Sequence, residues 1–219
     1  MSDFEVQRAK MVKNQLTSRD ITDQMVLAAM ESITRHEFVP EEYRSQAYAD
    51  HPVPIGHGQT ISQPYIVALM TQLLKLRSSD RVLEVGTGSG YQAAILAELC
   101  AEVYTIEIIK ALADQAAERL ARLGYKNVYV RHGDGYYGWE EHAPYDAVII
   151  TAAPDHIPPP LIAQLRDGGR LVAPIGPWGD YQELILVEKK GSKTVSRTIT
   201  RVVFVPLTGG HEENRARGW

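Results

Sequence analysis

A strand that runs directly into a glycine-rich turn and then into a helix is the feature that most limits how this chain can fold. The segment Val82-Leu83-Glu84-Val85-Gly86-Thr87-Gly88-Ser89-Gly90-Tyr91 carries this pattern. Glycines allow tight turning and let a ligand approach the backbone closely, and the helix that follows begins with unpaired N–H groups. We therefore expect a nucleotide-type cofactor site at the carboxyl end of the first strand of a parallel sheet.

Two classes of cofactor compete for such a turn. The dinucleotide fingerprint G-x-G-x-x-G binds a pyrophosphate, but Tyr91 stands where its third glycine would fall. Glu84 precedes the first glycine, and its carboxylate would repel a pyrophosphate. The same carboxylate would suit the ammonium group of an amino-acid cofactor, directly or through water. The pattern E-x-G-x-G-x-G therefore favours S-adenosylmethionine, which has that ammonium and no phosphate.

Two further acids follow the next two predicted strands. Glu107 stands where a carboxylate can accept both ribose hydroxyls, and Asp134 stands where one can accept the exocyclic amine of adenine. Each acid has an ordinary alternative, with Glu84 as a helix cap, Glu107 as a solvated strand end and Asp134 as a turn residue. Acids at the ends of three successive strands favour the cofactor interpretation. The cofactor-binding candidates are Glu84, Gly86, Thr87, Gly88, Ser89, Gly90, Glu107, Ile108, Asp134, Gly135 and Thr151.

Strands alternate with helices through the middle of the chain, which predicts an α/β fold with a doubly wound, mostly parallel, Rossmann-like sheet. The predicted strands are Arg81–Val85, Val103–Ile106, Val128–Arg131, Tyr145–Thr151 and Arg170–Ile175. The predicted helices among them are Tyr91–Cys100, Lys110–Leu123 and Pro160–Leu165. Too few residues separate the strand-like runs Glu183–Lys189 and Thr198–Leu207 for a helix, so we expect an antiparallel pair to close the sheet. One sequence does not determine the order of these last two strands.

The N-terminal part is expected to be helices and loops. We predict one domain over residues 1–219, with N-terminal helices and a substrate loop in 1–78 and the cofactor-binding core in 79–219. The predicted N-terminal elements are a helix over Asp3–Leu16, a second helix from about Met25 to Ile33 capped by Thr22 or Asp20, a loop over His51–Gly58, and a helix from Pro64 to about Leu76.

Composition excludes several classes of protein. The chain has 219 residues and a formal net charge of −4, with no basic cluster, so no nucleic-acid groove is expected. Its one cysteine, Cys100, excludes an intramolecular disulfide, and the seven histidines show no metal-ligand spacing. No apolar run reaches the ~18 residues of a membrane span. The N-terminus lacks a signal-peptide core, so we expect a cytoplasmic location without a metal or membrane contact.

The segment Ile55-Gly56-His57-Gly58-Gln59-Thr60-Ile61-Ser62-Gln63-Pro64 resembles a loop of the protein-L-isoaspartate O-methyltransferases, where a G-x-x-x-T-I-S-x-P pattern precedes the cofactor turn. The resemblance extends from about residue 5 to Leu207, and the tail 209–219 follows the family only loosely. Further matching segments are Val82 to Gln92, Gly133 to Gly135, Tyr145 to Ala153, Gly168 to Gly176 and Val205 to Thr208.

The resemblance implies an activity. Members of this family transfer a methyl group from S-adenosyl-L-methionine to the free carboxylate of L-isoaspartyl residues in damaged proteins and peptides, leaving S-adenosyl-L-homocysteine. The methyl ester then cyclises to a succinimide, which can reopen to normal aspartate. The family is typically cytosolic and often monomeric, and its active-site serine corresponds to Ser62. Isoaspartyl-containing proteins and peptides are thus the expected partners of a monomer.

This chemistry asks for alignment and exclusion of water rather than for a general base, because a carboxylate is already ionised at pH 7. Hydroxyl groups can hold the carboxylate without neutralising it, which makes Thr60 and Ser62 the catalytic candidates. The ordinary alternative for Ser62 is an N-cap for the helix that Pro64 begins. The substrate-binding candidates are Ile61, Ser62, Tyr65, Ala152, Val205 and Thr208.

Three other functions share some of these sequence features. A methyltransferase acting on a small molecule or RNA would keep the cofactor, but the T-I-S segment argues against it and the acidic balance argues against RNA. A protein that only binds isoaspartyl peptides is disfavoured because all the candidate cofactor acids and Ser62 are intact. A nicotinamide dehydrogenase is disfavoured by Glu84 and Tyr91.

Overall fold

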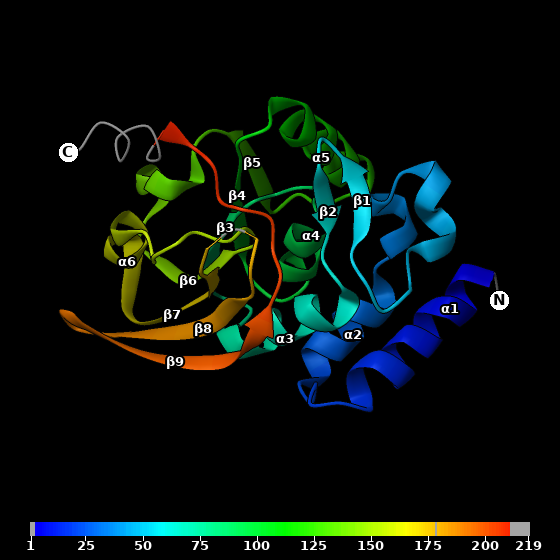
Figure 1. The fold of residues 1–219 in the computed structure, drawn as a ribbon, viewed down its shortest axis with the longest axis horizontal. Helices are drawn as coiled ribbons and strands as arrows, with labels where there is room; N and C mark the ends of the chain where they lie inside the picture. Colours follow the sequence, from blue (N-terminus) through cyan, green and yellow to red (C-terminus); the bar gives the residue numbers. More distant parts are fainter. Residues whose placement is uncertain (1–2, 178, 211–219) are drawn as a thin grey trace.

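The core of the molecule is a seven-stranded sheet in the order β5-β4-β3-β6-β7-β8-β9 (Figure 1). The computed structural model describes residues 3–177 and 179–210. Neighbouring strands are parallel from β5 to β7, and β8 and β9 each run antiparallel to the strand before them. The bounds are β3 (Arg81–Val85), β4 (Glu102–Glu107), β5 (Val128–His132), β6 (Tyr145–Ile150), β7 (Leu165–Ile175), β8 (Gln182–Lys190) and β9 (Lys193–Val202). The predicted doubly wound sheet with an antiparallel closing pair is confirmed.

Successive residues of the central strands are buried on opposite faces of the sheet, as expected when both faces are covered. Val82 and Ile149 belong to one apolar cluster, and Leu83 and Val148 belong to the other. The helices that contribute to these clusters are α3 (Pro64–Leu74), α4 (Tyr91–Ala97) and α5 (Lys110–Arg122) on the first face and α6 (Pro159–Gln164) on the second. The sheet is therefore a buried scaffold whose strand ends remain available for a site.

The N-terminal helices enlarge the first of these clusters (Figure 1). α1 (Asp3–Met11) continues as a π-helical segment, Val12–Thr17, and α2 (Gln24–Ser32) follows. Short 3₁₀ turns at Arg35–Phe38 and Glu41–Gln46 lead to a hairpin of two short strands. No helix in the described part of the chain is long and apolar enough to cross a bilayer.

The cap of α2 differs from the prediction. Asp23, rather than Thr22 or Asp20, accepts hydrogen bonds from the N–H groups of Met25 and Val26, at 3.0 and 3.2 Å. The backbone N–H of Thr22 is instead held by the side chain of Gln72 in α3, at 2.8 Å. This contact between distant segments sets where the helix begins.

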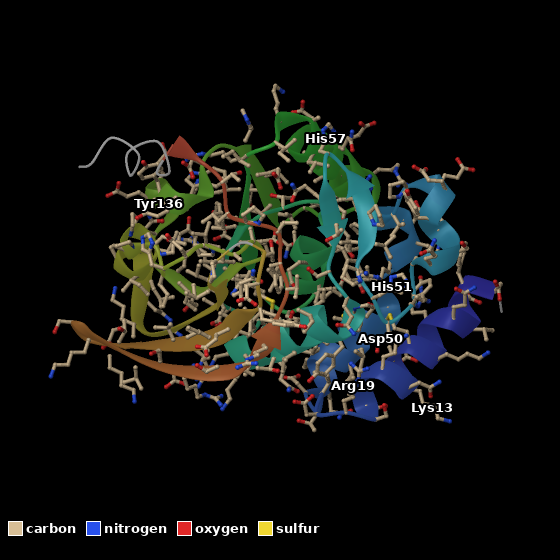
Figure 2. All side chains as sticks on the ribbon, in the orientation of Figure 1. Lys13, Arg19, Asp50, His51, His57 and Tyr136 are labelled. Carbon is tan, nitrogen blue, oxygen red and sulfur yellow. The ribbon has the colours of Figure 1, made fainter. Side chains whose placement is uncertain are left out.

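The predicted loop over His51–Gly58 is wrong, because this segment forms most of a two-stranded antiparallel hairpin. Its strands are β1 (Val53–Gly56) and β2 (Gln59–Ile61). His57 and Gly58 make the tight turn with positive φ values of 53° and 71°. Proline and glycine suggested a loop, but each strand of a two-stranded ribbon is an edge strand, where proline is tolerated. Figure 2 shows His57 at the outer tip of this hairpin.

The last strand also differs from the predicted Thr198–Leu207, because it begins at Lys193 and ends at Val202. A two-residue turn at Gly191-Ser192 lets β9 pair with β8 along nearly its whole length. Beyond Val202 the chain leaves the sheet edge and pairs with Ala153, whose N–H donates to the Val205 carbonyl at 2.7 Å. The crossing segment 203–208 thus lies beside the segment that follows β6.

Smaller differences affect helix ends. α3 ends at Leu74 because Lys75 adopts a left-handed conformation, with φ of 52°. α4 ends at Ala97 rather than Cys100, and β7 begins at Leu165, directly after α6. None of these shifts moves the predicted site residues to another element.

Candidate active site

A cavity of about 90 Å³, open to solvent, lies at the carboxyl ends of β3, β4 and β6. We call it the sheet-end cavity. Its walls are the glycine-rich turn, the hairpin strand β2, the ends of β4 and β6 and the crossing segment 203–208. The predicted site residues that line it are Thr60, Ile61, Ser62, Gly86, Thr87, Gly88, Ser89, Glu107, Ile108, Gly135, Thr151, Ala152, Val205 and Thr208.

A second cavity, of about 350 Å³, lies beside the first, and we call it the side cavity. Its outer wall includes Tyr181 and Val203, whose side chains are 64% and 69% exposed, and the exposed Arg201. The residues common to both linings are Thr60, Ser62, Thr151 and Val205. The two cavities therefore share the two predicted catalytic residues, Thr60 and Ser62.

The glycine-rich turn is locked to the end of β6 by Thr151. The Thr151 hydroxyl lies 3.0 Å from the Val85 carbonyl and 2.6 Å from the Gly86 carbonyl, and the Thr151 N–H donates to Val85 at 2.9 Å. Gly86 has φ of +98°, and a Cβ atom there would collide with the Thr151 hydroxyl. Only glycine fits at this position, which explains the start of the glycine pattern.

Glu107 is 6% exposed and braces the same turn from the end of β4. One carboxylate oxygen accepts the Gly88 N–H at 2.8 Å, and the other accepts the Ile109 N–H at 2.9 Å. Each carboxylate oxygen has a second lone pair, so both can still accept a hydroxyl from a ligand. The geometry is compatible with the predicted grip on a diol.

Glu84 is fully buried and lies outside the lining of the sheet-end cavity. Burial raises the pKa of Glu84 to about 8, a rise that Thr105 opposes and the charge of Glu107 increases. The Thr105 hydroxyl is 2.6 Å from that of Thr87, and neither Glu84 carboxylate oxygen has a hydrogen-bond partner among the described residues. A buried acid without hydrogen-bond partners lowers the stability of the free protein.

Asp134 and Gly90 also lie outside the described lining of the cavity. One Asp134 oxygen accepts the Tyr136 N–H at 2.9 Å, and the other accepts the Gly210 N–H at 3.0 Å. Asp134 therefore caps a turn and holds the last described residues of the chain, while residues 211–219 of the tail lie outside the described part. Its contact with an adenine amine stays a prediction. Gly90 is the residue before α4 and packs against Leu120.

Ser62 is not the cap of α3. The N-cap position is Gln63, which makes no side-chain capping bond, and the Ser62 hydroxyl has no hydrogen bond to any described residue. Gln63 instead donates to Asp50 at 2.8 Å, and Asp50 also forms an ion pair with Arg19. Figure 2 shows Arg19 and Asp50 side by side at the base of the hairpin. These contacts fix the chain around Ser62, which lines both cavities.

Several lining residues were not predicted. In the sheet-end cavity these are Gln59, Val67, Met70, Val85, Tyr91, Gln92, Ile106, Ile109, Pro206 and Leu207, and in the side cavity they include Pro52, Ile66, Tyr181, Arg201, Val203 and Phe204. Val67, Met70 and Gln92 come from buried faces of helices, where an apolar period indicates only a core. Tyr65 lines neither cavity, because its hydroxyl donates to Asp20 at 2.7 Å.

Within the described ranges, no group of three or more His, Cys, Asp or Glu side chains is placed to hold a metal ion.

The sheet, the glycine-rich turn and the acid at the end of the second core strand define an α/β protein of the methyltransferase fold. The family model of protein-L-isoaspartate(D-aspartate) O-methyltransferase (PCMT) matches residues 6–212. The chain belongs to this family.

Relatives and solved structures agree with this assignment. The chain is 58% identical over 202 residues to protein-L-isoaspartate O-methyltransferase 2 of Shewanella sediminis, covering 92% of this chain and 83% of the relative. It is similar to a solved protein-L-isoaspartate O-methyltransferase at a TM-score of 0.85 and 30% identity, covering 95% of this chain and 69% of that one. A Plasmodium falciparum structure of a putative family member, in complex with S-adenosyl-L-homocysteine, matches at a TM-score of 0.79 and 27% identity, covering 95% of this chain and 99% of that one.

We expect Glu84→Gln to stabilise the free protein at pH 8 by on the order of 2 kcal/mol, because the variant cannot carry an unpaired buried charge. The folded-state pKa of about 8 lies above the ordinary value of 4.5. The folded state therefore holds the proton more tightly, and wild-type stability falls as the pH rises between those values. Urea unfolding from pH 4.5 to 8 measures this, with the exposed Glu31→Gln as control. Parallel pH profiles for wild type and Glu84→Gln would contradict the assignment.

Proposed function

We propose that this protein transfers a methyl group from S-adenosyl-L-methionine to the free carboxylate of L-isoaspartyl residues in damaged proteins and peptides, starting their repair through a succinimide. The observation that carries the proposal is the meeting of the two cavities at Thr60, Ser62, Thr151 and Val205. A cofactor in one cavity and a peptide in the other would face each other across these residues. Membership of the family supports this activity.

The residues of the sheet-end cavity fit S-adenosyl-L-methionine. Glu107 would accept the ribose hydroxyls while it keeps its two backbone contacts. Glu84 lies outside that lining, and its buried carboxyl group, which has no cation paired to it in the described structure, would favour the cofactor ammonium through water. When bound, this cofactor supplies an electrophilic methyl group, and no metal is required. The related Plasmodium falciparum structure contains the corresponding product.

The residues at the shared boundary suit a carboxylate nucleophile. Hydroxyl donors at Thr60 and Ser62 can orient the acceptor without a formal positive charge that would lower its nucleophilicity. Ala152 is small and leaves space near the end of β6, and Val205 and Thr208 of the neighbouring crossing segment complete this part of the lining. Holding the acceptor in line and excluding water are the main contributions that the chain can make.

The side cavity suits the polypeptide on either side of the damaged residue. Its exposed apolar side chains, Tyr181 and Val203, can pack against varied sequences without selecting one.

We also propose a monomeric protein that acts in the cytoplasm and does not bind nucleic acid. The net charge of −4 disfavours binding to a polyanion.

Glu107→Ala is expected to weaken binding of S-adenosyl-L-homocysteine by roughly 10- to 100-fold, because charge-assisted hydrogen bonds to the ribose are lost. Isothermal titration measures this, and urea unfolding checks that the variant remains folded. Asp114→Ala is the matched control, since Asp114 is an exposed acid on α5 that pairs only with Lys110 among the described residues. Unchanged affinity in Glu107→Ala would contradict the ribose assignment.

Ser62→Ala is expected to lower kcat for an isoaspartyl peptide by at least roughly 10-fold, because the acceptor loses a hydrogen bond that aligns it. Affinity for S-adenosyl-L-homocysteine should stay within about twofold, since the bonds to the cofactor are elsewhere. Steady-state kinetics with Ser196→Ala, an exposed serine on β9, provide the comparison. A loss of stability with unchanged turnover would show that Ser62 has only a structural role.

The activity itself is tested with radiolabelled S-adenosyl-L-methionine and two matched peptides, one carrying isoaspartate and the other normal aspartate. We expect base-labile methyl groups on the isoaspartyl peptide alone. Label on neither peptide, with S-adenosyl-L-homocysteine still bound, would leave the cofactor site intact and refute the proposed acceptor.

A further inference from the structure

Arg35 is buried completely between the N-terminal helices and the candidate active site, with 0% of its surface exposed. Its Nε atom donates to the Ala47 carbonyl at 2.6 Å, and its Nη2 atom donates to the Ser62 carbonyl at 2.7 Å. The guanidinium also lies over the ring of Tyr91, with 4.7 Å from Cζ to the ring centroid. One side chain thus joins a 3₁₀ turn, the Ser62 segment and the first residue of α4.

No carboxylate among the described residues forms an ion pair with this guanidinium, and Nη1 has no hydrogen-bond partner there. Burial lowers the pKa of Arg35, with the neighbouring Tyr91 and Tyr48 opposing that change. A buried cation without an acid is a costly way to fill space, and an apolar side chain of similar volume would often give a more stable core. Packing alone therefore does not account for Arg35.

The contact between the guanidinium and the Ser62 carbonyl explains why an arginine is buried here. Ser62 lines both cavities, and its hydroxyl is the group expected to hold the acceptor carboxylate. A planar guanidinium can hold two carbonyls in fixed directions, which a flexible ammonium cannot. Drawing the Ser62 carbonyl inward fixes the rotation of that peptide unit and so the direction of the side chain. Tyr91, whose ring packs against the Arg35 guanidinium, lines the sheet-end cavity.

We propose that Arg35 is a positioning residue for methyl transfer: it acts through Ser62, holding the serine at the boundary between the two cavities without touching cofactor or substrate. This inference rests on the proposed function. It differs from that function in assigning a role to a residue that lines neither cavity.

A double-mutant cycle with Ser62 tests the proposal. In the wild-type background, Arg35→Met should lower kcat/KM for an isoaspartyl peptide by roughly 30-fold, and in the Ser62→Ala background by less than about threefold. Affinity for S-adenosyl-L-homocysteine should change by less than about threefold in either case. Arg35→Lys should recover part of the loss, because an ammonium can reach one carbonyl but not both. If Arg35→Met lowers kcat/KM by the same factor in the wild-type and Ser62→Ala backgrounds, the proposal is overturned.

Phe38→Leu is the control for a purely structural effect. Phe38 is 1% exposed, lies in the same 3₁₀ turn and contacts the Tyr91 ring at 5.4 Å between centroids, but it makes no bond to Ser62. Compared at equal distance below their melting temperatures, Arg35→Lys should lose turnover and Phe38→Leu should not. Equal losses in the two variants would overturn the proposal even if Arg35→Met fails to fold.

A readout that needs no activity separates this proposal from the proposed function. Amide hydrogen exchange over residues 59–64 should accelerate at least roughly 10-fold in Arg35→Lys relative to Phe38→Leu, because a carbonyl contact of that segment is weakened. Faster exchange in a protein that methylates no isoaspartyl peptide would refute the function but retain the positioning contact. Unchanged exchange would refute the positioning contact whatever the activity.

Discussion

The backbone pairing of Ala153 with the crossing segment 203–208 is the constraint on which the site depends. The Ala153 N–H donates to Val205, and the Ala153 carbonyl accepts the Leu207 N–H at 2.9 Å. This pairing draws the chain off the sheet edge and across the strand ends. Val205 consequently lines both cavities, so one segment forms a wall of each. Without this crossing segment, both cavities would lose one of their walls.

Two buried ionisable groups, Glu84 and Arg35, lie next to segments that line the two cavities. Neither has an oppositely charged partner among the described residues. Glu84 precedes the glycine-rich turn, and Arg35 holds the carbonyl of Ser62. Such groups reduce the stability of the free protein, and the reduction makes sense where a ligand or a reacting group benefits from the charge. Glu107, by contrast, accepts hydrogen bonds from two backbone N–H groups and braces the glycine-rich turn, and its contact with a ribose stays a prediction.

Patterns that are local in the chain predicted most of the architecture. The strand that leads into Gly86 and the alternating strands and helices lie within short segments, and the structure confirms them. Glu107 lies at the end of β4, where the sequence places it, while its role in binding stays a prediction. The hairpin β1-β2 was missed because Pro54 and Gly58 suggest a loop, whereas the burial of Val53, Ile55 and Ile61 that stabilises it depends on distant helices.

The remaining differences arise from contacts between distant segments. The end of β9 is set by pairing with Ala153 and not by any change in β propensity at Val202. Met70 and Gln92 belong to buried helix faces whose pattern indicates a core, and only helix packing turns part of those faces toward a cavity. Arg35 stands beside other charged residues, and nothing in that run indicates that its side chain would be buried against Ser62.

The central claim is that cofactor and substrate occupy separate cavities that meet at Ser62. A crystal structure of the protein with S-adenosyl-L-homocysteine and an isoaspartyl peptide tests it most directly. The account predicts the sulfur atom in the sheet-end cavity, the peptide chain in the side cavity beside Tyr181 and Val203, and its free carboxylate within hydrogen-bond distance of the Ser62 hydroxyl. A peptide bound away from the side cavity, or a carboxylate that faces away from Ser62 and the sulfur, would contradict the account.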